Sequence, residues 1–271
     1  MSRTFAALAL AALLSPVGCR PPQPAAPRIP SPPAPAALQA ALARAPVPPG
    51  LEGSGVLHLE LLGRAAPAMT ARFALAPDSG RATLRPGMLP PILSLWISSR
   101  DWQLRLPRQR VVVLGTSEAA DAGAGATDLA RLLWYVLVPR ALAAELADPQ
   151  LLETKEGWIL KGPVPRLASW ARGAEIWVDP VTLAIERWSL WPSSGECVLR
   201  LAYDPPVAEI ASGHVISFVG AWLGARGDLT LNQIRSGAIQ LTSRQLVPDG
   251  WTSIPPSDLP GWLQGLSEPT R

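Results

Sequence analysis

The sequence predicts an α+β fold that is mainly β: a curved antiparallel sheet, open as a half-barrel of about 10–12 strands and covered by a helical hairpin. Three observations support this prediction. Apolar and polar residues alternate over many short segments, turn signals separate these segments, and one segment near the middle of the chain has a helical pattern instead. A sheet with one apolar face needs a cover, and this segment is the one strongly apolar helical hairpin in the sequence.

The strand prediction rests on alternation with a period of two residues. Leu57, Leu59 and Leu61 alternate with His58 and Glu60. The same alternation recurs in residues 69–75, 102–106, 196–203 and 229–232. Such alternation places apolar side chains on one face of a sheet and polar side chains on the other.

Turn signals lie between these segments. Residues 77–80 read Pro-Asp-Ser-Gly, and further turn signals stand at 86–87, 193–195 and 249–250. Glycine, proline, asparagine and aspartate favour the backbone angles of tight turns. Consecutive strands joined by tight turns indicate an antiparallel meander.

The helical segment covers residues 127–146. Thr127 or Asp128 can cap its start, and Pro139 is expected to kink or end the first helix before Ala141–Leu146 continues it. Apolar residues with a spacing of 3.6 form one face of this helix: Leu129, Leu132, Leu133 and Val136. A helical cover seals a sheet less completely than a second sheet would, so it can leave an apolar cavity.

The N-terminus has the layout of a secretory signal. Arg3 precedes an apolar run over residues 5–14, which is too short to span a membrane. Cys19 stands where a cleavage site is expected, and the segment resembles the signal of a bacterial lipoprotein, although Pro16 replaces the usual leucine. The resemblance implies a signal peptide at residues 1–18 and a lipid on Cys19. The alternative is an ordinary signal peptide with an incidental cysteine.

A proline-rich stretch follows and is predicted to be a tether over residues 19–50. Residues 20–50 contain 11 prolines, which favour an extended chain. Within this stretch, Ala36–Arg44 lacks proline and pairs Leu38 with Leu42 at helical spacing, which predicts a short helix. The folded domain is expected at residues 51–254, followed by a C-terminal tail at 255–271.

Charge and reactive residues argue against several function classes. The chain has 24 basic and 21 acidic residues, a balance too even to indicate nucleic-acid binding. Its two histidines, His58 and His214, stand in no recognisable catalytic arrangement, and no cluster has metal-ligand spacing. Cys197 has no disulfide partner if Cys19 carries lipid. We therefore expect no enzymatic activity, no cofactor and no metal.

Two further sets of residues resemble the LolA/LolB-like lipoprotein carriers. Leu229–Asn232, followed by Gln245–Trp251, is similar to the final strand of that superfamily and its x-Pro-x-Gly ending, although Leu246 lies where phenylalanine is usual. Met69–Leu75 and Arg81–Arg85 resemble its second and third strands. The likeness covers roughly residues 38–254 and implies a cavity that accommodates acyl chains. The expected lining residues are Leu59, Phe73, Trp102, Leu129, Leu132, Leu133, Trp134 and Val136.

The resemblance implies a function and a location. Members of the superfamily bind the lipid part of lipoproteins, or other lipids, and move them toward the outer membrane. We therefore expect a lipid-anchored protein of the bacterial cell envelope, at the outer membrane and facing the periplasm. Its expected partners are the membrane, through the anchor, and lipid or lipoprotein acyl chains. The alternative is a scaffold lipoprotein with a fully packed core that binds an envelope protein, and a hydrolase is a more distant possibility.

Overall fold

A computed structural model describes residues 30–61, 63–98, 100–116, 126–167, 171–192, 197–220, 224–239, 241, 247–255 and 258, with residues 126–129 described by their backbone alone. The chain divides into two units, Met1–Pro30 and Ser31–Arg271, and every element below belongs to the second. The predicted signal peptide, Cys19 and all of the predicted tail except residues 255 and 258 lie outside the described residues.

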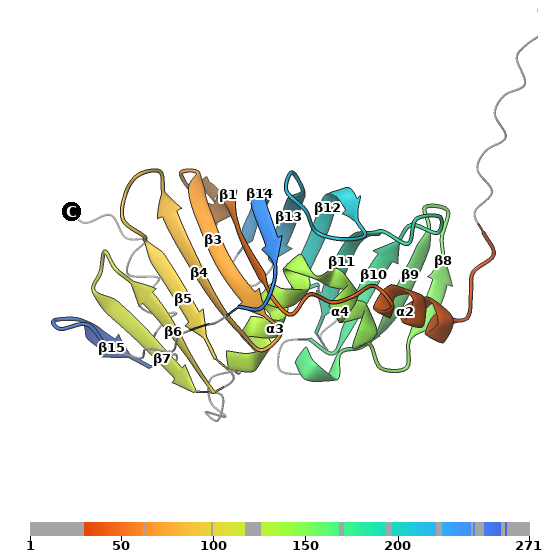
Figure 1. Cartoon of the computed structure of the whole chain (residues 1–271), viewed down its shortest axis with the longest axis horizontal. Coiled ribbons are helices and arrows are strands. Elements are labelled where there is room, and N and C mark those ends of the chain that lie inside the picture. The colour runs from red at the N-terminus through yellow and green to blue at the C-terminus, as the bar shows by residue number, and fades with distance from the viewer. Residues whose placement is uncertain are drawn as a thin grey trace, which may run out of the picture. The chain divides into compact units, whose positions relative to one another are not determined.

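One curved sheet of 15 strands forms the second unit (Figure 1). Its order is β15-β7-β6-β5-β4-β3-β1-β14-β13-β12-β11-β10-β9-β8, with β2 paired to β1. All pairs are antiparallel except β15 with β7. The strands are β1 (Leu51–Leu61), β2 (Arg64–Ala65), β3 (Met69–Ala76), β4 (Ser79–Pro86), β5 (Leu93–Ile97), β6 (Asp101–Leu106), β7 (Val111–Thr116), β8 (Gln150–Glu153), β9 (Trp158–Pro163), β10 (Gly173–Val178), β11 (Ile185–Trp191), β12 (Leu199–Val207), β13 (Val215–Gly220), β14 (Ala225–Ser236) and β15 (Thr252–Ile254).

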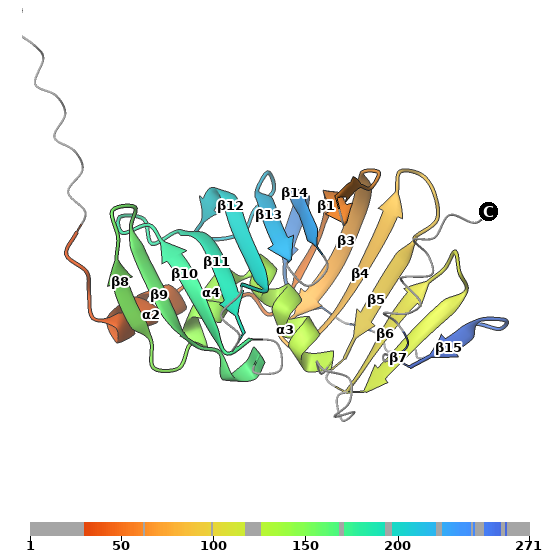
Figure 2. The same cartoon turned by 180° about the vertical axis from the view of Figure 1, so that it is seen from behind.

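The connectivity explains why helices cover the inner face. The chain forms β1 and then β3 to β7 outward toward one edge, whereas β8 starts at the opposite edge and β9 to β14 return to β1. The segment between β7 and β8 must therefore run across one face of the sheet, from near one edge to the other. This segment contains α3 (Ala126–Leu137) and α4 (Pro139–Ala144), which Figures 1 and 2 show along one side of the curved sheet.

The two covering helices meet at Val138. Its backbone angles, φ −130° and ψ 68°, lie outside the helical region, and Pro139 begins α4. Proline lacks an amide hydrogen and fits the first turn of a helix but not its interior. The predicted interruption of the helical segment at Pro139 is therefore present. A third helix, α2 (Pro35–Ala43), packs beside α4 and agrees with the short helix expected at Ala36–Arg44.

A single large core joins the sheet to all three helices. Its largest fully buried side chains include Trp134 and Tyr135 of α3, Trp188 of β11 and Leu142 of α4. Leu38 and Leu42 of α2 belong to the same core, with exposed fractions of 1% and 0%. The range predicted as a tether thus includes a helix that packs into the core. The fold is a curved, mainly β half-barrel with a helical cover, as expected, but with more strands and with one parallel pair.

Candidate functional site: an apolar pocket at the junction of the covering helices

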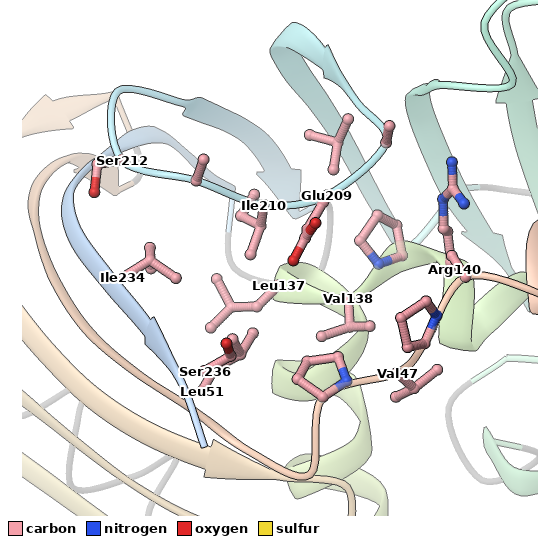
Figure 3. Close-up of a pocket in the computed structure, with 17 residues that line it drawn as sticks. Val47, Leu51, Leu137, Val138, Arg140, Glu209, Ile210, Ser212, Ile234 and Ser236 are labelled. Atoms are coloured by element: carbon pink, nitrogen blue, oxygen red, sulfur yellow. The ribbon is translucent and has the colours of Figure 1, made fainter.

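A cavity with a volume of about 610 Å³ lies where α3 meets α4. Figure 3 shows its walls. Leu51 of β1 and Ile234 of β14 come from the sheet, and Leu137 and Val138 come from the helix junction. Other lining residues come from the linker after α2 and from the end of β12 with the loop that follows it: Ala45, Pro46, Val47, Pro48, Val207, Ala208, Glu209, Ile210, Ala211 and Ser212.

The local sequence explains why a cavity remains at this point. Pro139 interrupts the helix, so the two helices cannot continue as one rod across the end of β1 and β14. The linker around Val47 contains three prolines and lines the cavity as an irregular segment. Neither the helix junction nor this linker packs with the regular spacing of a helix or strand. The space between the junction and the linker is therefore incompletely filled. The remaining lining residues are Pro139, Arg140 and Ser236.

Few polar side chains line the cavity. Arg140 is half-buried, and its Nη2 donates a 3.4 Å hydrogen bond to the Leu183 carbonyl oxygen. Glu209, Ser212 and Ser236 are exposed. The arrangement fits a ligand with an apolar body, because most of the lining residues are aliphatic or proline and the polar side chains are few. A volume between about 300 and 1,000 Å³ is typical of sites for small organic ligands.

Polar contacts outside the cavity hold the covering helices in place. Arg131 of α3 forms a 2.9 Å ion pair with Asp78 in the β3–β4 turn. The Tyr135 hydroxyl donates a hydrogen bond to the Glu145 carboxylate just after α4. Burial, together with this bond to a carboxylate, raises the pKa of Tyr135 above its ordinary range. These contacts fix α3 against the sheet and against the end of α4.

The residues predicted to line the cavity lie elsewhere. Phe73, Leu132 and Trp134 are buried in the core, and Leu133 and Val136 are half-buried against it. Trp102 packs in a second cluster with Ile97 and Ala130, and Leu59 is half-buried beside a smaller hollow. Leu129 lies on α3, and its side chain is outside the described residues. Of those whose side chains the structure describes, none lines this cavity. A lipid-binding role for all eight predicted residues remains a prediction.

Sequence reasoning missed the residues that do form the cavity. Leu137 and Val138 directly follow the predicted helical face, and the interruption expected at Pro139 was the available signal for them. Val47 and Ile210 lie in irregular segments, where no periodicity marks a buried residue. Leu229–Asn232 is the segment that resembles the final strand of the LolA/LolB-like carriers. Ile234 lies just after this segment and belongs to the same strand, β14.

The groups associated with catalysis are dispersed. His58 is exposed on β1, and the His214 Nδ1 lies 3.1 Å from the Ala211 amide nitrogen in a turn. The half-buried Cys197 thiol lies 3.3 Å from the Leu199 carbonyl oxygen. Among the described residues, no group of three or more His, Cys, Asp or Glu side chains is arranged to hold a metal ion. No helix in this part of the chain is long and apolar enough to cross a membrane.

Comparisons with known proteins identify the fold. No protein-family model matches the chain, and no curated protein is a significant match. A LolA superfamily protein from Nitrosomonas europaea aligns with a TM-score of 0.52 and 12% identity, over 77% of this chain and 96% of that chain. A putative outer membrane lipoprotein-sorting protein domain from Vibrio parahaemolyticus aligns with a TM-score of 0.50 and 11% identity, over 74% and 90% of the two chains. The chain therefore has the LolA/LolB-like fold that its sequence resemblance implied.

Proposed function

We propose that this protein binds lipid, or the acyl chains of lipoproteins, in the apolar pocket at the junction of α3 and α4. The observation that carries the proposal is the pocket itself: about 610 Å³, walled by Leu51, Leu137, Val138, Ile210 and Ile234. The LolA superfamily fold and the lipoprotein-sorting domain among its structural neighbours support the same class of ligand. In this proposal the role is that of a binding protein without catalytic activity.

The physics of burial is sufficient for such a role. Removing apolar surface from water gains about 25 cal/mol per Å², so one acyl chain in an aliphatic pocket needs no other strong interaction. The polar edge, with Arg140 and Glu209, would leave the polar end of the ligand near solvent. A lipid is therefore expected to enter tail first.

The proposal places the protein in the bacterial envelope, anchored at the outer membrane by a lipid on Cys19. A proline-rich tether after Cys19, reaching about 3.1 Å per residue where it is extended, would give the folded unit freedom to approach other lipids. Binding an acyl chain close to a membrane would suit a step of lipid or lipoprotein transfer. The scaffold function expected as an alternative requires a packed interior, and the cavity favours lipid binding over it.

The test uses the full chain, which is extracted with detergent and purified. Mass spectrometry is expected to find copurified lipid, and the delipidated protein is expected to take up a fluorescent fatty acid. Val47→Asp places a charge at the edge of the pocket, on a side chain that is already 44% exposed, and is expected to weaken uptake. Val181→Asp is the matched control, because Val181 is 70% exposed and lies outside the pocket lining.

The outcomes separate the candidate functions. Lipid binding that Val47→Asp weakens and Val181→Asp leaves unchanged supports the proposal. Repeated absence of lipid, together with no fatty-acid uptake, would overturn it and favour the scaffold. Hydrolysis of a generic ester that is lost on changing His58 or His214 would instead support an enzyme.

A further inference from the structure

A second hollow lies on the opposite, outer face of the same sheet and is polar. It has a volume of about 590 Å³ and is lined by strands β14, β1, β3 and β4, which lie side by side (Figure 1). Three arginines line it: Arg72 on β3, Arg81 on β4 and Arg235 on β14. Glu52 is the one acidic residue among its described lining residues.

The register of the strands brings these groups to one face. Leu51 and Leu75 are cross-strand partners and point into the core under the helices, and successive side chains of a strand alternate between faces. Ser54 of β1 therefore points outward, and it is paired with Arg72 on one side and with Gln233 on the other. Thr83 is the next cross-strand partner of Arg72. Hydroxyl, amide and guanidinium groups from four strands thus line one hollow of the outer face.

The positive charge of this hollow is only partly neutralised. Glu52 is directly opposite Arg235 in the register, but its ion pair is with Arg81. That pair is long, 3.7 Å, and its two side chains are 60% and 62% exposed, so it is weak. Neither Arg72 nor Arg235 forms an ion pair with a described acidic residue. Gathering like charges in one place is unfavourable unless an anion compensates for them.

We propose that this hollow is an oxyanion site that binds a phosphate-type group through Arg72, Arg81 and Arg235. Guanidinium groups present paired donors that match the oxygens of a phosphate, and the bonds are strengthened by charge. Ser54, Thr83 and Gln233 supply neutral donors to the remaining oxygens. The ligand is free phosphate, a phosphate monoester or the phosphate headgroup of a lipid. The site goes beyond the proposed lipid-binding function, because the sheet separates it from the apolar pocket.

The experiment measures phosphate binding to the full chain by titration calorimetry at low salt, with inorganic phosphate as the probe. The double variant Arg72→Gln/Arg235→Gln is expected to weaken binding at least about tenfold, since it removes two charged hydrogen-bonding groups. Glu52→Gln is expected to strengthen binding several-fold, because it removes the competing negative charge. This gain cannot come from misfolding. Arg200→Gln is the matched control, since Arg200 is exposed on β12 and lies outside the hollow.

Vesicles distinguish the source of the phosphate group. Selective binding to phosphatidylcholine vesicles that contain phosphatidic acid, lost in the double variant, identifies a lipid headgroup. Phosphate binding without vesicle binding identifies a free ligand. No phosphate binding by the unmodified protein, or an equal loss in Arg200→Gln, would overturn the proposal. Fatty-acid uptake measured in the same samples is expected to stay unchanged, so failure here is distinguishable from failure of the apolar pocket.

Discussion

The Trp188 indole nitrogen of β11 donates a 2.7 Å hydrogen bond to the Tyr203 hydroxyl of β12 inside the core. That hydroxyl in turn donates a 2.9 Å bond to the Val136 carbonyl oxygen near the end of α3. The last carbonyls of a helix lack partners within the helix, so this bond satisfies one of them from the sheet. A buried polar chain therefore ties the covering helix to two strands, beside the junction that forms the pocket.

Tyr203→Phe breaks this chain without changing the size of the ring. The Trp188 nitrogen and the Val136 oxygen would each lose a partner in a buried environment, at a cost of about 1–3 kcal/mol in the free energy of unfolding. Denaturant unfolding followed by tryptophan fluorescence measures the loss. Trp191→Phe is the control, because the Trp191 indole bonds only to Ser189 in a half-buried position and should cost less. Equal effects of the two substitutions would contradict the proposed contribution of this chain of hydrogen bonds to stability.

The two tyrosines predict sensitivity to alkaline pH. Burial raises the pKa of both Tyr135 and Tyr203, so the folded protein holds their protons at pH values where the unfolded chain releases them. The stabilisation from the two protonated tyrosines is fully present below about pH 10, the ordinary pKa of tyrosine. Above that pH, the free energy of unfolding falls by about 1.4 kcal/mol per pH unit for each tyrosine. Denaturant unfolding at a series of alkaline pH values measures the slope.

The same tyrosines provide an internal check. Since the chain has only two, the absorbance of tyrosinate reports directly on Tyr135 and Tyr203. We expect this absorbance to appear together with unfolding and not before it. The slope of stability against pH should decrease in Tyr203→Phe, because one of the two linked protons is gone. Tyrosinate formation in a protein that remains folded near pH 10 would refute the assigned burial.

Docking of α2 is predicted to stabilise the folded unit. Leu38→Ala removes a buried side chain from the core and is expected to cost about 2–5 kcal/mol. Gln39 lies beside it, and its side-chain amide donates to the Ala143 and Leu146 carbonyl oxygens at the end of α4, at 3.0 and 2.8 Å. Thermal unfolding of Leu38→Ala measures the effect. Ala37→Ser, an exposed change on the same helix, should be nearly neutral, and similar stability of both variants would show that α2 is not part of the core.

Local patterns were sufficient to predict most of the strands and the covering helices. The alternation in Leu57–Leu61 and the helical spacing of Leu132 and Val136 depend only on nearby residues, and these features were predictable from the sequence. The pairing of β1 with β14 is different, because it joins residues such as Leu57 and Leu229 that lie far apart in the chain. No local pattern specifies which strands become neighbours across such a separation.

The pocket was hard to predict for a related reason. The sequence predicted its cover, but it pointed to the helical face around Trp134, and in the structure that face is packed against the sheet. Cavities remain where regular packing ends, and Val47 and Ile210 come from segments without periodicity. The many prolines of residues 20–50 predict an extended tether. They give no indication that Leu38 is buried in the core or that Val47 lines the cavity.

The pairing of β1 with β14 also yields a test of how the two halves of the sheet are held together. At Gly227 the strands approach so closely that an added Cβ atom would lie 2.2 Å from the His58 carbonyl oxygen and 2.9 Å from the Phe218 ring. Since the first of these atoms is backbone, Gly227→Ala must push the strands apart, and we expect a loss of about 1–3 kcal/mol. Denaturant unfolding measures it.

Gly237→Ala is the matched control for the seam, the paired strands β1 and β14. Gly237 follows the end of β14, and an added Cβ atom would meet nothing within 4 Å, so this variant should be neutral or slightly more stable, because alanine restricts the unfolded chain. Hydrogen exchange should show faster exchange along β1 and β14 in Gly227→Ala and unchanged exchange in β9 and β10, which lie away from the seam. Equal stability of the two alanine variants would mean that the strands can separate at Gly227 without cost. In that case the seam would not hold the half-barrel together.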